Sequence, residues 1–150
     1  MSRIATRPAT AADIDAVAAL FDAYRQFYEQ PPDLALARDY LAERFHRKES
    51  VVIVAEDDDG ALIGFTQLYP TFCSVRASHT FVLYDLFVTP SARGTGAGRA
   101  LLLAAEAYAR RAGAARMELS TARTNKIGQS LYESVGWKLD ETFLVYGKDL

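Results

Sequence analysis

The residues best placed to do chemistry form a glycine-dense turn, which consists of Arg93, Gly94, Thr95, Gly96, Ala97 and Gly98. An apolar, strand-like run at 81–88 precedes this turn, and a segment with apolar residues at helical spacing follows it at 100–112. Glycines let the backbone approach an anion closely, and the N–H groups at a helix N-terminus point toward it. Arg93 and Arg99 add positive charge at the two ends of the turn. The pattern predicts a site for a ligand that carries phosphates.

Three phosphate-binding patterns compete for this turn. A P-loop requires a lysine and a hydroxyl residue after its last glycine, whereas Arg99 and Ala100 follow Gly98. The dinucleotide fingerprint G-x-G-x-x-G fails by one residue, although Glu118 lies at a suitable distance downstream. A nucleotide-binding module therefore stays open as a weaker alternative. The third pattern, R-x-x-G-x-G after a strand, is satisfied.

On this third pattern the chain resembles the GNAT superfamily of acyl-CoA-dependent N-acetyltransferases. A second segment, in the same order as in the family, supports the resemblance: Asn125 and Lys126 are followed at 131–137 by Leu-Tyr-Glu-Ser-Val-Gly-Trp. The likeness extends over essentially the whole chain and is strongest at 83–137. It implies an α/β (α+β) GNAT fold, in which about four helices flank a mixed, mostly antiparallel twisted sheet of six to seven strands, as a single domain at 1–150.

The elements read from the sequence agree with that fold. A relative of the capping box, Thr10 with Asp13, opens the first helix, and Pro31 and Pro32 end it. The hydrophobic pattern predicts a second helix at 33–45, a third at 100–112 and a short one from Asn125 to Gly136. Strands are expected at 4–7, 51–55, 61–69, 81–88, 116–120 and 143–146, with a loop at 70–79.

The resemblance implies acetyl-CoA as the co-substrate, with its pyrophosphate on the turn at 93–98 and on Arg99. It also implies that a backbone N–H near Phe87 or Val88 stabilises the oxyanion that develops on the thioester carbonyl. Asn125 would contact the cofactor, although the residue taken alone is better explained as the cap of its own helix. Tyr132 matches the family's tyrosine that contacts the cofactor and protonates the leaving thiolate, and its alternative is packing beside Leu131.

The general base is less clearly encoded. An amine with a pKa near 10.4 is almost fully protonated at pH 7, so the site must remove a proton or select the neutral form. Tyr84 stands where several relatives carry glutamate, and Asp85 beside it is expected to face the opposite side of the sheet. Asp85 is either catalytic or a polar residue that stabilises the strand edge. Glu29, His79 and a water chain are the other candidates.

The family's acceptor groove corresponds here to the first two helices and the loop at 70–79. Tyr24, Tyr28 and Glu29 could receive a cationic amine through cation–π and ion-pair contacts. The resemblance favours a small-molecule primary amine, such as a polyamine or an amino acid, as the acceptor. A protein lysine or N-terminus is the alternative acceptor, and a non-catalytic CoA-sensing module is the alternative function.

Composition narrows the partners further. At 150 residues, with 50% hydrophobic content, one domain with a substantial core is expected. A formal charge of −2 disfavours nucleic acid and anionic membranes as partners. Cys73 is the single cysteine, so we expect no disulfide and no zinc cluster, and we expect no metal site and a cytoplasmic location. A homodimer is expected through the strand at 143–146.

Overall fold

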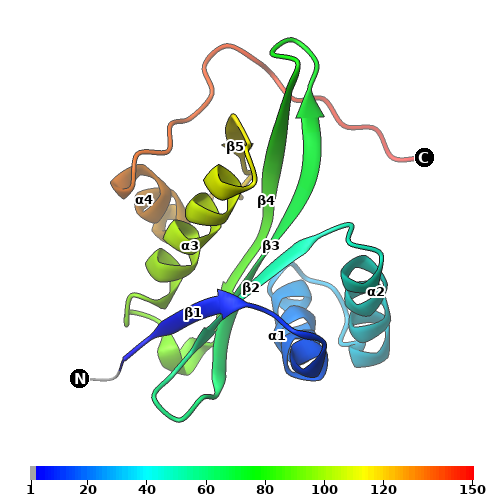
Figure 1. Cartoon of the computed structure of the whole chain (residues 1–150), viewed down its shortest axis with the longest axis vertical. Helices are drawn as coiled ribbons and strands as arrows, with labels where there is room; N and C mark the ends of the chain where they lie inside the picture. Colours follow the sequence, from blue (N-terminus) through cyan, green and yellow to red (C-terminus); the bar gives the residue numbers. More distant parts are fainter. Residues whose placement is uncertain (1–2) are drawn as a thin grey trace. The chain divides into compact units, whose positions relative to one another are not determined.

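A computed structural model describes residues 3–150, and the chain divides into two compact units, Met1–Ser120 and Thr121–Leu150. Figure 1 labels the helices and strands. The first unit contains the sheet and α1 to α3, and the second contains α4. The helices are α1 (Ile14–Phe27), α2 (Leu34–His46), α3 (Ala97–Arg111) and α4 (Lys126–Ser134).

The sheet has five strands in the order β1-β2-β3-β4-β5. Neighbours from β1 to β4 are antiparallel, and β4 and β5 are parallel. The prediction of a mixed, mostly antiparallel sheet with four helices is thus confirmed, with five strands rather than six or seven. The strands are β1 (Ala5–Pro8), β2 (Val51–Glu56), β3 (Leu62–Cys73), β4 (Ser78–Val88) and β5 (Arg116–Glu118).

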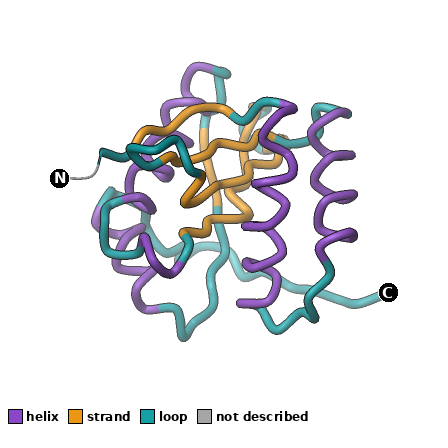
Figure 2. The backbone as a smooth tube through the Cα atoms, turned by 90° about the horizontal axis from the view of Figure 1, so that it is seen from below, coloured by secondary structure: helices purple, strands orange, loops and turns teal. Residues whose placement is uncertain are grey.

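The helices of the first unit cover both faces of its sheet. Figures 1 and 2 show α1 and α2 side by side on one face and α3 on the other. On the first face, Val17 and Phe21 of α1 pack with Leu41 of α2 against Phe65 and Phe87 of the central strands. Burial of these side chains supplies the main driving force for docking α1 and α2 on the sheet.

The entry into α1 is fixed by an acidic cap. The backbone N–H of Thr10 donates to the Asp13 carboxylate (2.7 Å), which confirms the predicted relative of the capping box. Arg7 on β1 forms a bidentate pair with the same carboxylate (2.7 and 2.9 Å) and also pairs with Glu56 on β2. These contacts connect the first two strands to the start of α1.

A β-bulge interrupts the pairing of β3 with β4. Gln67 is opposite Asp85 and Leu68 is opposite Leu83, so Tyr84 is the extra residue of β4. The expectation that Tyr84 and Asp85 face opposite sides of the sheet is therefore wrong, because strict alternation fails at a bulge. Both side chains line one cavity on the α1 face.

The expected loop at 70–79 is also corrected. β3 continues to Cys73 and β4 starts at Ser78, so only residues 74–77 form the turn of a long hairpin. Backbone pairing continues to the hairpin tip although the side chains there are exposed, with Phe72 79% exposed. Burial is thus not needed to hold this strand pair, and the hydrophobic pattern underestimated its length.

In the second unit, α4 begins after Asn125, as expected, and Gly136 adopts a φ of +96° just beyond its end. The expected last strand at 143–146 is absent from the described structure. Its four side chains, Phe143, Leu144, Val145 and Tyr146, are between 72% and 94% exposed. A β-branched and aromatic sequence forms a strand only where an edge supplies hydrogen-bond partners, and no such partner contacts these residues within the described chain.

Candidate active site

The glycine turn has the backbone geometry that the sequence predicts. Gly94 and Gly96 have φ values of +77° and +92°, and a Cβ at either position would meet no heavy atom within 4 Å. α3 starts at Ala97, and its first backbone bond runs from the Ala100 N–H to the Gly96 C=O (3.0 Å). The preceding N–H groups at 97–99 therefore lack intrahelical acceptors and are available to an anion.

Arg93 links this turn to the end of β4. Its Nε donates to the Val88 C=O (3.0 Å), and its guanidinium lies 5.5 Å from the centre of the Phe87 ring. Arg93 and Arg99 are both exposed. Positive charge thus lies beside the N-terminus of α3, which is also the positive end of the helix dipole. Both favour the binding of an anion.

The strand before the turn presents an open edge. β5 pairs with β4 only at 80–82, so within the described first unit residues 83–88 of β4 have no strand partner on that side. The Thr89 N–H donates to Ile63 on β3 (2.8 Å). Because N–H groups alternate along an antiparallel strand, those of Leu86 and Val88 point to the open edge, whereas that of Phe87 points to β3.

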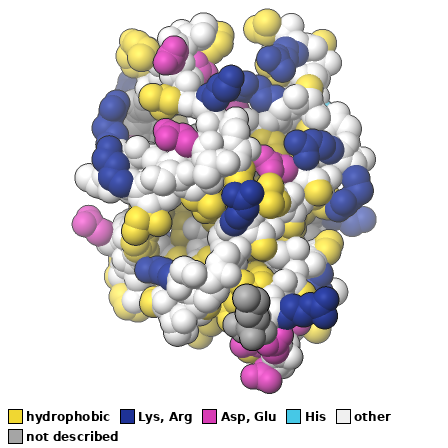
Figure 3. All heavy atoms as spheres, turned by 90° about the vertical axis from the view of Figure 1, so that its left-hand side faces the viewer, with side chains coloured by type: hydrophobic (Ala, Val, Ile, Leu, Met, Phe, Trp, Pro, Cys, Tyr) yellow, Lys and Arg dark blue, Asp and Glu magenta, His cyan; other side chains and the backbone are white. Residues whose placement is uncertain are grey.

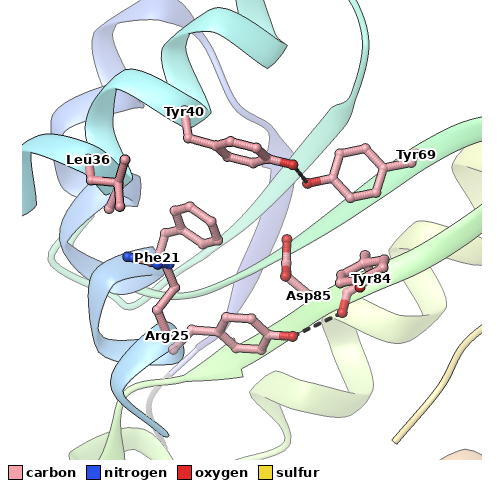
Figure 4. A pocket seen from close by; sticks show the side chains of 9 residues that line it. Phe21, Arg25, Leu36, Tyr40, Tyr69, Tyr84 and Asp85 are labelled. Atoms are coloured by element: carbon pink, nitrogen blue, oxygen red, sulfur yellow. Dashed lines mark hydrogen bonds between the residues drawn. The ribbon is translucent and has the colours of Figure 1, made fainter. Parts of the chain in front are cut away.

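A cavity of about 310 Å³ lies on the face of the sheet that α1 and α2 cover, between these two helices and strands β3 and β4. Figure 4 shows its lining, which is mainly aromatic. Tyr84 and Asp85 come from β4 and Tyr69 comes from β3. The helices supply Phe21, Tyr24, Arg25, Leu36, Ala37 and Tyr40. The size and the apolar walls are those of a pocket for a small molecule.

Asp85 is the acidic group of this cavity. Only 2% of the residue is exposed, and its Oδ2 accepts a 2.6 Å hydrogen bond from Gln67 Nε2. Burial raises the pKa of Asp85 from 3.8 to about 6, against the opposing effect of hydrogen bonds from Gln67 and Tyr24. The carboxyl group can therefore exchange a proton near neutral pH, which is the property of a general base.

Tyrosine hydroxyls surround the Asp85 carboxylate. Tyr24 donates to the Tyr84 backbone C=O (3.1 Å), and the hydroxyls of Tyr40 and Tyr69 share a hydrogen bond of 2.8 Å (Figure 4). Burial, with the Asp85 charge as the next cause, raises the pKa of Tyr24. Burial, the bond to Tyr40 and the Asp85 charge raise the pKa of Tyr69. Both phenols thus stay neutral donors at the pH where Asp85 titrates.

Other predicted residues lie outside the cavity lining. Glu29 is exposed just beyond α1 with a φ of +65°, and His79 lies on the hairpin, where its Nδ1 is 3.0 Å from the Thr71 carbonyl oxygen. Tyr28 packs against Tyr24, with ring centres 5.1 Å apart, and is 41% exposed. Of the predicted base and acceptor residues, the structure brings together Tyr24, Tyr84 and Asp85.

In the second unit, Asn125 caps α4. Its side chain accepts from the Gly128 N–H (3.1 Å) and donates to the Thr121 hydroxyl (3.0 Å). A Cβ at Gly128 would lie 2.5 Å from Asn125 Nδ2, so glycine there makes room for the cap. Tyr132 lies on the same helix, with its ring 6.3 Å from that of Trp137. Asn125 thus has the capping role that was its alternative.

Sequence reasoning missed three polar residues of the lining, Tyr69, Tyr40 and Arg25, and also Gln67, which holds Asp85 from outside the lining. Gln67 lies in an apolar strand pattern, and a buried glutamine there is a detectable signal, because an uncharged polar residue in a core strand needs a partner. Tyr69 lies two residues beyond Gln67, on the same face of β3. Tyr40 and Arg25 have no comparable signal, since aromatic and basic residues are ordinary on helix surfaces.

Three further observations concern surface charge, membrane-spanning helices and metal ligands. Lys and Arg side chains are interspersed with Asp and Glu on the face in Figure 3. Among residues 3–150, no helix has the length and apolar character to cross a bilayer. Over the same residues, no cluster of three or more His, Cys, Asp or Glu side chains has an arrangement that could hold a metal ion.

Comparisons with known proteins agree with this geometry. The model of the acetyltransferase (GNAT) family matches residues 15–137. The chain is 46% identical to an uncharacterized N-acetyltransferase, YhfO, of Bacillus subtilis strain 168, and the match covers 93% of each protein. The chain is also 30% identical to a probable acetyltransferase of Haemophilus influenzae, and the match covers 85% of this chain and 86% of that protein.

Solved structures share the fold. The crystal structure of a probable acetyltransferase superposes with a TM-score of 0.90 at 37% identity, covering 99% of this chain and 97% of that one.

Proposed function

Because this chain belongs to the acetyltransferase (GNAT) family, we propose that it transfers the acetyl group of acetyl-CoA to the amino group of a small molecule. The observation that carries the proposal is Asp85, a buried carboxylate with a pKa of about 6 in an open-mouthed aromatic cavity. It lies on the strand that leads into the glycine turn. An aminoglycoside N-acetyltransferase, AAC(6')-Iy, solved with CoA, shares the fold with a TM-score of 0.80 at 21% identity. The superposition covers 100% of this chain and 97% of that protein.

The glycine turn fits the pyrophosphate of CoA. The free N–H groups at 97–99 and the empty space beside Gly94 and Gly96 form a cradle that a Cβ would narrow. Arg93 and Arg99 supply the charge that a diphosphate requires. When bound, acetyl-CoA supplies an acetyl thioester, so that a C–N bond forms with the amine as the C–S bond breaks.

Asp85 takes the amine proton in this proposal. A carboxylate with a pKa of about 6 is ionised at pH 7 and can accept a proton from an ammonium group held in the cavity. Gln67 Oε1 is buried and has no hydrogen-bond partner in the described structure. A carboxyl proton on Asp85 would complete a second hydrogen bond to this oxygen, so Gln67 can support both protonation states.

The remaining two groups act on the acetyl donor. The N–H of Leu86 or Val88, at the open edge of β4, is the candidate donor to the developing oxyanion. The sequence resemblance implies Phe87 or Val88 as the oxyanion donor. Because the N–H of Phe87 faces β3, Leu86 takes its place as a candidate. Tyr132 is proposed to give its hydroxyl proton to the departing CoA sulfur. The nitrogen loses a second proton as the amide forms, which restores the phenol, and the first proton leaves Asp85 for solvent.

The test is release of free thiol from acetyl-CoA over a panel of polyamines, amino acids and lysine peptides. Turnover on one class of amine, with a loss of about 100-fold or more in kcat/KM in Asp85→Asn, is the expected result. Turnover that survives this substitution would remove Asp85 as the base. Demonstrated CoA binding with no turnover on any amine would contradict the proposed function itself.

We also propose that the chain forms a homodimer through residues 143–146. Their four consecutive exposed apolar side chains support this, because a contiguous apolar surface is stabilised when a protein partner removes it from water. Sedimentation at working concentration should give twice the 16.5 kDa of one chain, and a species of 16.5 kDa would refute the dimer.

A further inference from the structure

The cavity that holds Asp85 contains a second charged group that the proposed reaction does not use. Arg25 extends from α1 into the lining, and Figure 4 shows its guanidinium beside Phe21 and Leu36, on the other side of the cavity from Asp85. The cavity is thus lined by one carboxylate and one guanidinium, separated by aromatic surface.

One nitrogen of the guanidinium has no partner in the described part of the protein. Arg25 Nη1 is buried and has no hydrogen-bond partner in the described structure. A buried N–H donor without a partner costs stability, and in native proteins it is rare enough to require an explanation. A ligand that draws the guanidinium toward the cavity and accepts a hydrogen bond from it would remove the cost.

Neighbouring carboxylates do not supply that acceptor. Asp22, one turn earlier on α1, accepts from the Asp33 N–H (2.9 Å) and from Gln26 Nε2 (3.2 Å), and not from Arg25 Nη1, which has no partner among the described residues. Glu29 is exposed beyond the end of the helix. Asp85 is held by Gln67 on the sheet. The positive charge at Arg25 is therefore available to an anionic ligand.

We propose that the amine acceptor also carries a carboxylate, and that Arg25 binds this carboxylate while Asp85 faces the amino group. The inference rests on the proposed function and names its substrate class, an amino acid or a related amino-carboxylic acid. A guanidinium matches a carboxylate through paired hydrogen bonds, and the cavity of about 310 Å³ has room for a molecule of this size. Polyamines carry no group for Arg25.

The test compares matched acceptors that differ only in the acidic group. Amino acids of different chain length, such as glycine, phenylalanine and 4-aminobutyrate, are assayed beside their carboxamides by thiol release from acetyl-CoA. An amide next to an amine lowers the pKa of that amine and raises its neutral fraction, so intrinsic reactivity favours the carboxamide. We expect at least one acid to exceed its amide by about tenfold or more in kcat/KM.

Substitution of Arg25 assigns the effect. Arg25→Met keeps an apolar side chain in the lining and should abolish the preference for the acid, so that kcat/KM for the acid and for its amide lie within about threefold of each other. Arg38→Met is the control, because Arg38 lies on α2, is half-exposed and pairs with Asp15 (2.6 Å). This variant should keep the preference. Equal use of acid and amide by the native chain, or a preference that survives Arg25→Met, would overturn the inference.

Two further arms separate the possible causes. The affinity for CoA should be unchanged in Arg25→Met, and a tenfold loss would assign the guanidinium to a CoA phosphate instead and refute the inference. If no amine of the wider panel is acetylated either, the proposed function fails, and the inference is decided by binding. Acetylation of polyamines alone would leave the proposed function standing and overturn the inference. In that case the acids, and not the amides, must raise the Tm of the native chain but not that of Arg25→Met.

Discussion

Replacing Asp85 with asparagine should stabilise the protein while it removes activity. Burial raises the pKa of this carboxyl from 3.8 to about 6, which corresponds to about 3 kcal/mol of free energy. The folded state binds the proton more tightly than the unfolded state, so the free energy of unfolding falls as pH rises from about 4 to about 6. Above pH 6 the full cost of a buried charge is present.

Asparagine carries no charge and can form hydrogen bonds to both polar atoms of the Gln67 amide. We therefore expect Asp85→Asn to raise the free energy of unfolding by up to about 3 kcal/mol at pH 8, and by almost nothing at pH 4. Urea denaturation at both pH values measures this difference. Asp39→Asn, which changes an exposed carboxylate on α2, is the matched control and should have little effect at either pH.

Ionisation of Asp85, which lowers the free energy of unfolding, should raise the activity. The kcat/KM of the native chain should rise with pH through an apparent pKa of about 6, because only ionised Asp85 accepts a proton. Asp85→Asn should lose about 100-fold and should lack this limb of the profile. An asparagine variant that is no more stable at pH 8 would refute the reasoning about burial. A native profile that is flat between pH 5 and 7 would refute the role as base.

Three further substitutions test other parts of the structure. Gly96→Ala and its control Gly113→Ala place a Cβ at φ values of +92° and +82°, with no contact within 4 Å. Each should cost about 1 kcal/mol in urea denaturation, and only Gly96→Ala should weaken CoA binding in calorimetry. Tyr132→Phe should lower kcat about tenfold in the thiol assay with CoA affinity unchanged, and an unchanged kcat would remove it as the acid. Asp13→Asn should cost about 1 kcal/mol at pH 7, because the partly exposed Arg7 holds the pKa of Asp13 well below its usual range. That loss should shrink as pH falls through 4, and a constant loss would contradict the ion pair.

The fold was largely predictable because its signals are local. The caps at Thr10 and Asn125, the prolines after α1 and the apolar spacing of α1 and α3 each depend on a few adjacent residues. The positive φ at Gly96 is likewise a local matter, because glycine adopts it without strain. Such features are set by backbone sterics and nearby hydrogen bonds, so they can be read without knowing the tertiary structure.

The cavity was only partly predictable because it depends on pairing between distant strands. The bulge that turns Tyr84 toward the side of Asp85 exists only in the register of β3 against β4. The hydrogen bond from Gln67 to Asp85 joins residues 18 positions apart. The predicted strand at 143–146 fails for a related reason, since its β propensity has no partner edge within the described chain.

Unsatisfied polar groups are concentrated at this cavity, and this concentration argues for a ligand. Four buried side-chain polar atoms lack a partner in the described structure, and two of them are serine hydroxyls, which can rotate. The other two are Arg25 Nη1, in the cavity lining, and Gln67 Oε1, on the residue that holds Asp85. With the ionised Asp85, the cavity and the adjoining Gln67 thus contain an unpaired donor, an unpaired acceptor and a buried charge that hydrogen bonds stabilise only in part. A bound amino-carboxylic acid would satisfy the guanidinium with its carboxylate, and the proton it gives to Asp85 would satisfy Gln67. The same atoms that cost stability in the free protein would then supply specificity in the complex.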